Sequence, residues 1–299
     1  KRLGAVSALV ATGGYGRREL APYSDIDLLF LQPEDGRAST AAVEYMLYLL
    51  WDIGLKVGHA VRTVNECVEE SLKDITIRTT LLEARLIAGD AGLYAAFEKA
   101  YQERVVKGSG LAFVAAKLKE REQRHARFGD SRYMLEPNVK ESAGGLRDLQ
   151  TLFWITRYLY GIGTLDGLLQ AQIITASEAQ QVSAAQDFLW KVRCHLHLQA
   201  GRAEDRLTFD IQGDIAGRLG YGGQNANERG EIFMRDYFRM VRTIGTLTRI
   251  ICAHIEGEFA TRITGAEGDS LLPRPHDGAL EGFVVRNGWL DISSDRQFE

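Results

Sequence analysis

Two short apolar runs, separated by a glycine pair and a polar turn, constrain the fold of this chain more than any other feature. Residues 5–11 (AVSALVA) close on Thr12, Gly13 and Gly14, and residues 25–31 (DIDLLFL) follow after a short basic segment. Apolar runs of this length, bounded by turn-forming residues, predict buried β-strands. We therefore expect two strands joined by a tight turn or a short helix.

The rest of the first hundred residues mixes short strands and helices. Residues 55–61 (LKVGHAV) alternate in polarity and predict a third strand. Helical spacing of apolar residues predicts four helices, at residues 41–51, 64–72, 75–83 and 93–103. Strands and helices interleaved this closely predict an α/β or α+β domain, which we assign to residues 1–107.

Strand patterns are rare after a plausible linker at residues 107–110 (KGSG). Long amphipathic helices are expected at residues 111–128, 146–160, 177–200 and 228–254. We assign residues 108–256 to a mainly helical domain, and residues 257–299 to a linker and the start of a truncated following region. The absence of an initial Met and of a closing element suggests a piece of a longer protein.

Composition excludes several classes of protein. With 36 Lys and Arg against 40 Asp and Glu, the net charge of −4 argues against a general nucleic-acid binder. No apolar run is long enough to span a membrane. Cys67, Cys194 and Cys252 lie far apart and form no C-x-x-C pair, so we expect reduced thiols in a cytoplasmic protein.

The candidate catalytic residues are Asp25 and Asp27. Side chains at positions i and i+2 of a strand share a face and lie about 6.6 Å apart. Two carboxylates so placed can hold Mg²⁺, which prefers one or two carboxylates together with substrate phosphates. The alternative is a turn pair, but acids on an apolar strand are costly to bury unless their charge is compensated. The apolar Ile26 between them is expected to face the core.

The glycine pair fits the same chemistry. Because Gly13 and Gly14 have no Cβ, the backbone can come close to a phosphate and present its N–H groups. Arg17 and Arg18 follow at once and are near enough to neutralise phosphate charge, although either can equally face solvent. The segment predicts a metal-dependent nucleotidyltransferase site.

This pattern resembles the DNA polymerase beta-like nucleotidyltransferase superfamily. Residues 13–31 (GGYGRRELAPYSDIDLLFL) look specifically like the bacterial PII uridylyltransferase/uridylyl-removing enzymes. Residues 136–150 (EPNVKESAGGLRDLQ) resemble the helical domain of the same family, and residues 202–207 do so more weakly. The resemblance covers most of the chain and implies an α+β fold, with a mixed-sheet nucleotidyltransferase domain followed by a helical bundle.

The resemblance also implies an activity. The family transfers UMP from UTP to a tyrosine hydroxyl of the PII nitrogen-signalling protein and releases pyrophosphate. By position, Gly13, Gly14 and Ser24 would line the phosphates, while Asp25 and Asp27 would ligate Mg²⁺. Full-length members also carry an HD-type hydrolase domain that removes UMP and ACT domains that sense glutamine; the chain is expected to stop before them.

One departure from the superfamily pattern leaves a role open. A third acid usually lies on a later strand, but residues 55–62 contain none. Asp52 precedes this strand and Glu66 follows it. His59 lies within it and can act as a base near neutral pH, although a structural histidine is equally compatible with the sequence.

The second motif predicts a phosphate contact. Lys140 and Arg147 flank a Gly144-Gly145 turn before a helix, and they are expected to contact the β- and γ-phosphates of a nucleotide held between the two domains. The alternative is a helix-entry loop with ordinary surface ion pairs.

Other features and readings remain. Packing explains Cys194 to His197 better than metal binding, because positions i and i+2 of a helix do not share a face. His276-Asp277 is interpreted as a chance dipeptide. Two rival functions stay open: transfer to another acceptor, such as glutamine synthetase or an aminoglycoside, and a non-catalytic nucleotide-sensing module.

Overall fold

The computed structural model describes residues 7–34, 40–128, 134–264, 283–286 and 289–292. The chain divides into two compact units, Lys1–Leu247 and Thr248–Glu299. The predicted dipeptide His276-Asp277 lies outside the described residues. The second unit contains a small hairpin, in which β5 (Phe283–Arg286) pairs antiparallel with β6 (Trp289–Ile292).

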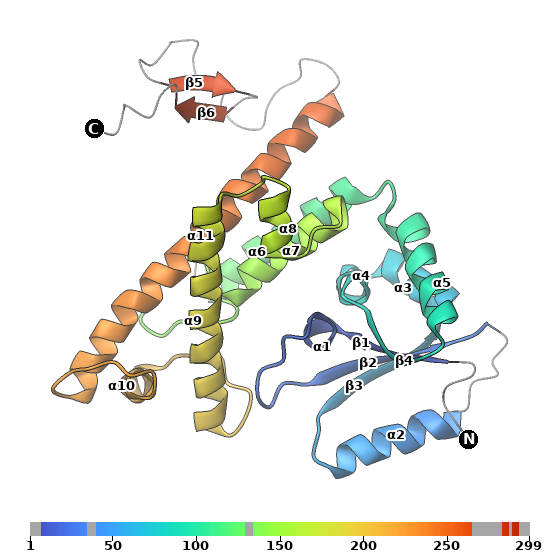
Figure 1. Ribbon diagram of the computed structural model, residues 1–299, viewed down its shortest axis with the longest axis horizontal. Helices are drawn as coiled ribbons and strands as arrows, with labels where there is room; N and C mark the ends of the chain where they lie inside the picture. Colours follow the sequence, from blue (N-terminus) through green and yellow to red (C-terminus); the bar gives the residue numbers. More distant parts are fainter. Residues whose placement is uncertain (1–6, 35–39, 129–133, 265–282, 287–288, 293–299) are drawn as a thin grey trace. The chain divides into compact units, whose positions relative to one another are not determined.

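A four-stranded mixed sheet forms the N-terminal part of the first unit (Figure 1). Its strands, in the spatial order β3-β2-β1-β4, are β3 (Val57–Thr63), β2 (Ile26–Gln32), β1 (Ala8–Thr12) and β4 (Arg85–Gly89). The strand β1 pairs antiparallel with both β2 and β4, whereas β2 and β3 are parallel. The central pair β1 and β2 therefore has a neighbour on each side.

Side chains alternate along β2 and pack into two hydrophobic clusters, one on each face of the sheet. Leu28 and Phe30 pack with Val43 and Leu47 of α2 (Thr40–Asp52), and Ile26 packs against the same cluster. Leu29 and Leu31 point to the other face, into a larger cluster. Both faces of the sheet are therefore covered, which explains why β2 is almost continuously apolar after Asp27.

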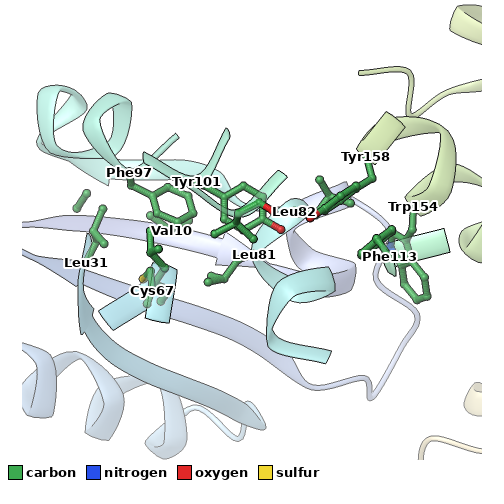
Figure 2. Packing of buried hydrophobic residues seen from close by; sticks show 14 residues of the cluster. Val10, Leu31, Cys67, Leu81, Leu82, Phe97, Tyr101, Phe113, Trp154 and Tyr158 are labelled. Carbon is green, nitrogen blue, oxygen red and sulfur yellow. Dashed lines mark hydrogen bonds between the residues drawn. The ribbon is translucent and has the colours of Figure 1, made fainter. Parts of the chain in front are cut away.

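The larger cluster joins the sheet to the helices (Figure 2). On the sheet side, Val10 and Leu31 meet Phe97 of α5 (Ala91–Tyr101). On the other side, Phe113 of α6 (Gly110–Phe128) stacks on Tyr158 of α7 (Leu146–Tyr160), with ring centroids 3.8 Å apart. One continuous apolar core thus runs from the strands into the helical part.

The remaining elements are short connecting helices and long bundle helices. They are α1 (Gly13–Arg17), α3 (Val64–Lys73), α4 (Ile75–Leu82), a π-helical segment (Gln102–Val106), α8 (Leu165–Gln170), α9 (Ala176–Ala200), α10 (Phe209–Arg218) and α11 (Ala226–Thr264).

The predicted α+β class is confirmed: a mixed sheet is followed by a mainly helical region. The division at residue 107 stays a prediction, since the unit Lys1–Leu247 contains both parts. No helix among the described residues is long and apolar enough to cross a membrane. Cys67 and Cys194 are free thiols, as expected.

Candidate active site

Asp27 lies at the start of β2, an inner strand of the sheet, next to the turn that closes β1. It is the second residue of β2, opposite Thr12 of β1 on one side and Gly58 of β3 on the other. Asp25 directly precedes β2, so it belongs to the entry loop rather than to the strand. Asp25 is exposed and Asp27 is half-buried. The two carboxylates therefore lie at the same end of β2, with Ile26 between them in the core, as predicted.

Two glycines leave room for the Asp27 carboxylate. A Cβ on Gly13 would lie 2.9 Å from Asp27 Oδ2, and a Cβ on Gly58 would lie 2.7 Å from Asp27 Oδ1. Both distances are below ordinary van der Waals contact. Gly13 also has a φ of +56°, a left-handed conformation that glycine adopts without strain. The missing side chains at these two positions define the space in which Asp27 sits.

The electrostatics of the acid pair favour a bound cation. Burial raises the pKa of Asp27, and the neighbouring charge of Asp25 raises it further. Among the contacts of the described residues, no arginine or lysine forms an ion pair with either carboxylate. Two acids that repel one another, without an internal cation to neutralise them, form an anionic site.

The donor set fits Mg²⁺. Within the described residues, no group of three or more His, Cys, Asp or Glu side chains is placed to hold a metal ion. A pair of carboxylates is nevertheless the set that Mg²⁺ uses when substrate phosphates and water complete its coordination. Asp25 and Asp27 are therefore the residues of this segment that would hold it.

None of the three candidates for the third acid or base joins this pair. His59 is the register partner of Leu28, so it points to the face opposite Asp27, where its ring meets Trp51 with centroids 6.2 Å apart. Glu66 accepts the backbone N–H of Thr63 and completes a capping box at the start of α3. Asp52 lies exposed at the end of α2.

Arg17 is bound inside the protein. Its guanidinium donates to both carboxylate oxygens of Glu83 at 2.5 Å, and to Glu19 at 3.1 Å. Glu83 is 3% exposed and also accepts the indole N–H of Trp154 on α7. Burial raises the pKa of Glu83, while Arg17 and the Trp154 donor act in the opposite direction. Arg17 therefore ties α1 to the core, and a phosphate would have to share it.

A cavity of about 660 Å³ lies beside this ion pair. It is lined by Gly16 to Glu19, by the start of β4 and by residues of α7, α8 and α9, but by neither Asp25 nor Asp27. The cavity is therefore distinct from the carboxylate pair.

The loop before Asp25 is held in an unusual conformation. Tyr23 has a φ of +61°, which is rare for a residue with a side chain, and Ser24 N–H donates to Ala21 O at 3.1 Å. Ser24 is partly exposed and directly adjacent to Asp25. The turn therefore fixes where the predicted phosphate contact and the first carboxylate lie.

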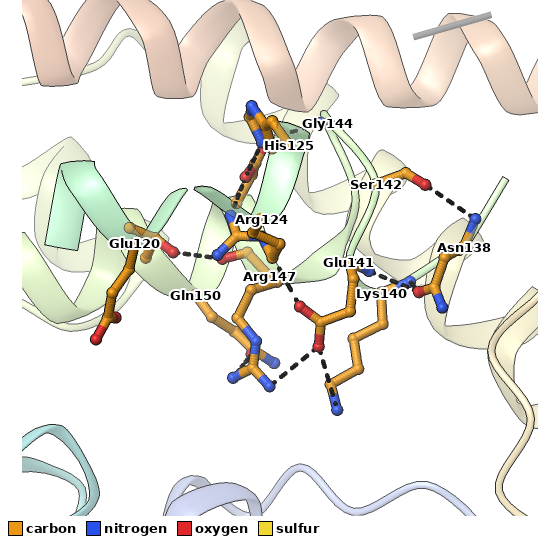
Figure 3. Close-up of polar contacts among 12 residues, drawn as sticks. Glu120, Arg124, His125, Asn138, Lys140, Glu141, Ser142, Gly144, Arg147 and Gln150 are labelled. Carbon is orange, nitrogen blue, oxygen red and sulfur yellow. Dashed lines mark hydrogen bonds and ion pairs between the residues drawn. The ribbon is translucent and has the colours of Figure 1, made fainter. Parts of the chain in front are cut away.

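The second motif forms an ordered loop before α7 (Figure 3). The Asn138 side chain accepts the backbone N–H groups of Lys140 and Glu141 at 3.1 and 2.7 Å. Gly144 has a φ of +78°, and a Cβ there would lie 2.3 Å from Val241 O, so only glycine fits. Asp148, 3% exposed, accepts the Gly144 N–H at 2.7 Å.

Lys140 and Arg147 extend from this loop to the same side (Figure 3). Arg147 donates to Gln150 and Glu141, and Lys140 lies 3.5 Å from Glu141. Burial and the neighbouring charge of Arg147 lower the pKa of Lys140. Both side chains remain about a quarter exposed. They are thus paired with one acid, as the surface-pair alternative expects, yet each keeps an accessible face.

The structure brings Gly13 together with Asp27, and Lys140 with Arg147. Among the described residues, no hydrogen bond or ion pair directly joins these two groups. Sequence reasoning missed Gly58, Glu83 and Asp205, because each gains its role from contacts far along the chain. The motif at residues 202–207 was the one available signal for Asp205.

Comparison with known proteins links both motifs. Residues 112–252 match the family model described as GlnD PII-uridylyltransferase. A "Bifunctional uridylyltransferase/uridylyl-removing enzyme" of Azospirillum brasilense is 48% identical over 297 residues, covering 99% of this chain and 32% of that protein. Proteins of the same description from Rhodospirillum rubrum and Phenylobacterium zucineum are 50% and 53% identical, over 100% and 84% of this chain and 32% and 27% of their own lengths.

The chain thus spans about a third of the length of these relatives. The alignment with the Rhodospirillum rubrum protein covers the segment with the two carboxylates, which the family model does not cover. Along its whole length the chain is similar to bifunctional uridylyltransferase/uridylyl-removing enzymes, and its residues 112–252 match the GlnD PII-uridylyltransferase family model.

Proposed function

We propose that this chain carries a Mg²⁺-dependent uridylyltransferase activity that moves UMP from UTP to a tyrosine hydroxyl of a PII signal protein, with release of pyrophosphate. The names of the relatives and of the family model support the reaction class. The observation that carries the proposal is the pair Asp25 and Asp27: it has no internal cation among the described residues, and it sits in a space kept open by Gly13 and Gly58.

Each side chain has a role in this proposal. Asp25 and Asp27 would hold Mg²⁺, which when bound offsets the negative charge of the triphosphate and of the leaving pyrophosphate. The backbone N–H groups of the turn at Gly13 and Gly14 would contact a phosphate, and the Ser24 hydroxyl can donate to it.

The basic residues complete the phosphate site. Lys140 and Arg147 can donate to the β- and γ-phosphates, because each keeps an accessible face. In the reaction, the acceptor oxygen forms a bond to the α-phosphorus, the bond from that phosphorus to the bridging oxygen breaks, and pyrophosphate leaves. The hydroxyl proton passes to water; His59 is not in a position to take it from the Asp27 side of the sheet.

The test is pyrophosphate release with each of the four nucleoside triphosphates, with and without purified PII protein. We expect release with UTP that requires both Mg²⁺ and PII. Asp25→Asn and Asp27→Asn should each lack it. Equal pyrophosphate release with glutamine synthetase or an aminoglycoside in place of PII would indicate a nucleotidyltransferase that acts on another acceptor. Triphosphate binding without release would point to a sensing module, and either result would overturn the proposal.

The remaining assignments accompany this function. We propose a nucleotidyltransferase domain at residues 1–107 and a helical domain at residues 108–256, with residues 257–299 outside both. Free thiols at Cys67 and Cys194 support a cytoplasmic location. The acidic balance of charge supports a partner other than nucleic acid.

A further inference from the structure

A fully buried histidine connects the helical part to the loop before Asp25. His197 of α9 is 0% exposed. Its Nδ1 lies 2.5 Å from the carbonyl oxygen of Pro22, and its Nε2 lies 2.9 Å from Asp205 Oδ1. A carbonyl oxygen only accepts hydrogen bonds, so Nδ1 must carry the hydrogen in this contact. The ring therefore donates to the backbone three residues before the first carboxylate.

Asp205 links this histidine to the basic motif. Its carboxylate accepts Arg193 Nε at 2.7 Å as well as His197. Its backbone carbonyl accepts the N–H of Val139 at 2.8 Å, one residue before Lys140. Burial acts to raise the pKa of Asp205, but the donors from Arg193 and His197 hold it below its ordinary value. One residue thus binds both the histidine and the start of the Lys140 loop.

The Pro22–Ser24 loop, at the Pro22 end of the His197 ring, needs contacts that hold its conformation. The left-handed φ of Tyr23 is strained for a residue with a side chain. A strained conformation persists only where surrounding contacts determine it. The turn from Ser24 to Ala21 supplies one contact, and the bond from His197 to Pro22 supplies the other.

We propose that His197 and Asp205 are positioning residues that fix the Pro22–Ser24 loop relative to the Lys140 loop, and so hold the carboxylate half and the basic half of the site in one geometry. The inference rests on the proposed function for its kinetic consequence only. A displacement of about 1 Å in such a site can lower the rate about 100-fold. Neither residue needs to touch substrate for this effect.

The variants separate the two bonds of the ring. In His197→Asn, the side-chain amide takes the place of Nδ1 and can still donate to Pro22 O. In His197→Gln, the amide reaches the place of Nε2 and can donate only toward Asp205. His195→Ala is the matched control, because His195 lies on the same helix two residues away and is only partly buried.

Two measurements test the inference in the full chain. By hydrogen–deuterium exchange, residues 20–27 should exchange at least about tenfold faster in His197→Gln than in wild type, and less so in His197→Asn. By kinetics, kcat for pyrophosphate release should fall about 10- to 100-fold in His197→Gln, with a smaller change in the KM for UTP. His195→Ala should match wild type in both.

The exchange result does not depend on activity. If wild type releases no pyrophosphate, the proposed function fails, while exchange at residues 20–27 still decides whether His197 holds the loop. Unchanged exchange in a folded His197→Gln variant, or an effect equal to that of His195→Ala, would overturn the inference. A larger loss in His197→Asn than in His197→Gln would overturn it as well.

Discussion

Asp27 lies opposite Gly58 in the parallel pairing of β2 and β3, so close that a Cβ on Gly58 would stand 2.7 Å from Asp27 Oδ1. A strand ordinarily favours residues with side chains, because glycine loses more chain entropy on folding. Glycine at this position therefore leaves space for the Asp27 carboxylate and does not stabilise the strand. The same relationship holds for Gly13 on the side of Oδ2.

Gly58→Ala should displace the Asp27 carboxylate and impair catalysis without unfolding the protein. The clash involves only the end of a side chain, which can rotate away at little cost. We expect at least a tenfold lower kcat/KM for pyrophosphate release and a weaker Mg²⁺ dependence, with a melting temperature within about 3 °C of wild type.

The control for this substitution is Gly222→Ala. A Cβ at Gly222 meets nothing within 4 Å, so activity should not change. Full activity and an unchanged Mg²⁺ titration in Gly58→Ala would show that the space beside Asp27 has no role in metal binding.

Asp27→Asn should separate function from stability. The loss of a metal ligand removes several kcal/mol of transition-state stabilisation, or roughly 100-fold or more in rate. Stability should move the other way. Because the pKa of Asp27 is raised in the folded protein, its ionised form disfavours folding once the pH exceeds the unfolded-state value of about 4.

In metal-free buffer at pH 7, the melting temperature of Asp27→Asn should therefore equal or exceed that of wild type. The difference should vanish below about pH 4, where the carboxyl is protonated in both states. Added Mg²⁺ should raise the melting temperature of wild type but not of the variant. A variant that melts well below wild type at pH 7 would contradict the assigned role.

Glu83 should make a large contribution to the free energy of unfolding. Glu83→Ala would leave the Trp154 indole N–H buried without its acceptor and would leave the Arg17 guanidinium with Glu19 as its only remaining carboxylate partner among the described residues. Removing one partner of a buried ion pair typically costs about 3–5 kcal/mol. Urea denaturation should show a loss of that size, and Glu83→Gln, which keeps an acceptor oxygen, should lose less.

Glu70→Ala, which breaks an exposed pair with Lys73, should hardly change stability. Equal effects of all three substitutions would contradict this account.

The parts of the site that depend on local sequence could be predicted, and the parts that depend on pairing across the chain could not. Gly13, Asp25 and Asp27 are close in the sequence, so they were predicted to lie near one another, although Asp25 lies in the entry loop and not on the strand as expected. The role of Gly58 depends on the register in which β3 pairs with β2, and the sequence of β3 alone does not reveal that register. For the same reason the sequence did not show on which face of the sheet His59 lies, because a shift of one residue in the register would move it to the other face.

The fold shows the same division. Helices α6, α7 and α9 have an apolar periodicity and were predicted to within one residue at each end, whereas α11 continues to Thr264, ten residues beyond its predicted end. Strand β4 was missed, because Arg85–Gly89 is a short edge strand that is exposed along much of its length. Helices α8 and α10 are also short and gain their stability from packing rather than from their own pattern.

Asp148→Asn should destabilise the loop that carries Lys140, in a manner that depends on pH. Burial acts to raise the pKa of Asp148, but donors from His125, Arg124 and the Gly144 N–H hold it below its ordinary value. An acid with a lowered pKa stabilises the fold above its unfolded-state value of about 4, and this contribution is lost as the pH falls further. Urea denaturation at pH 7 should show a loss of about 3 kcal/mol in the variant, because Arg124 stays buried without its carboxylate. The difference from wild type should narrow toward pH 3. Asp210→Asn, at an exposed position, should follow wild type at every pH, whereas a loss in Asp148→Asn that stays constant from pH 7 to pH 3 would show that shape rather than charge matters at this position.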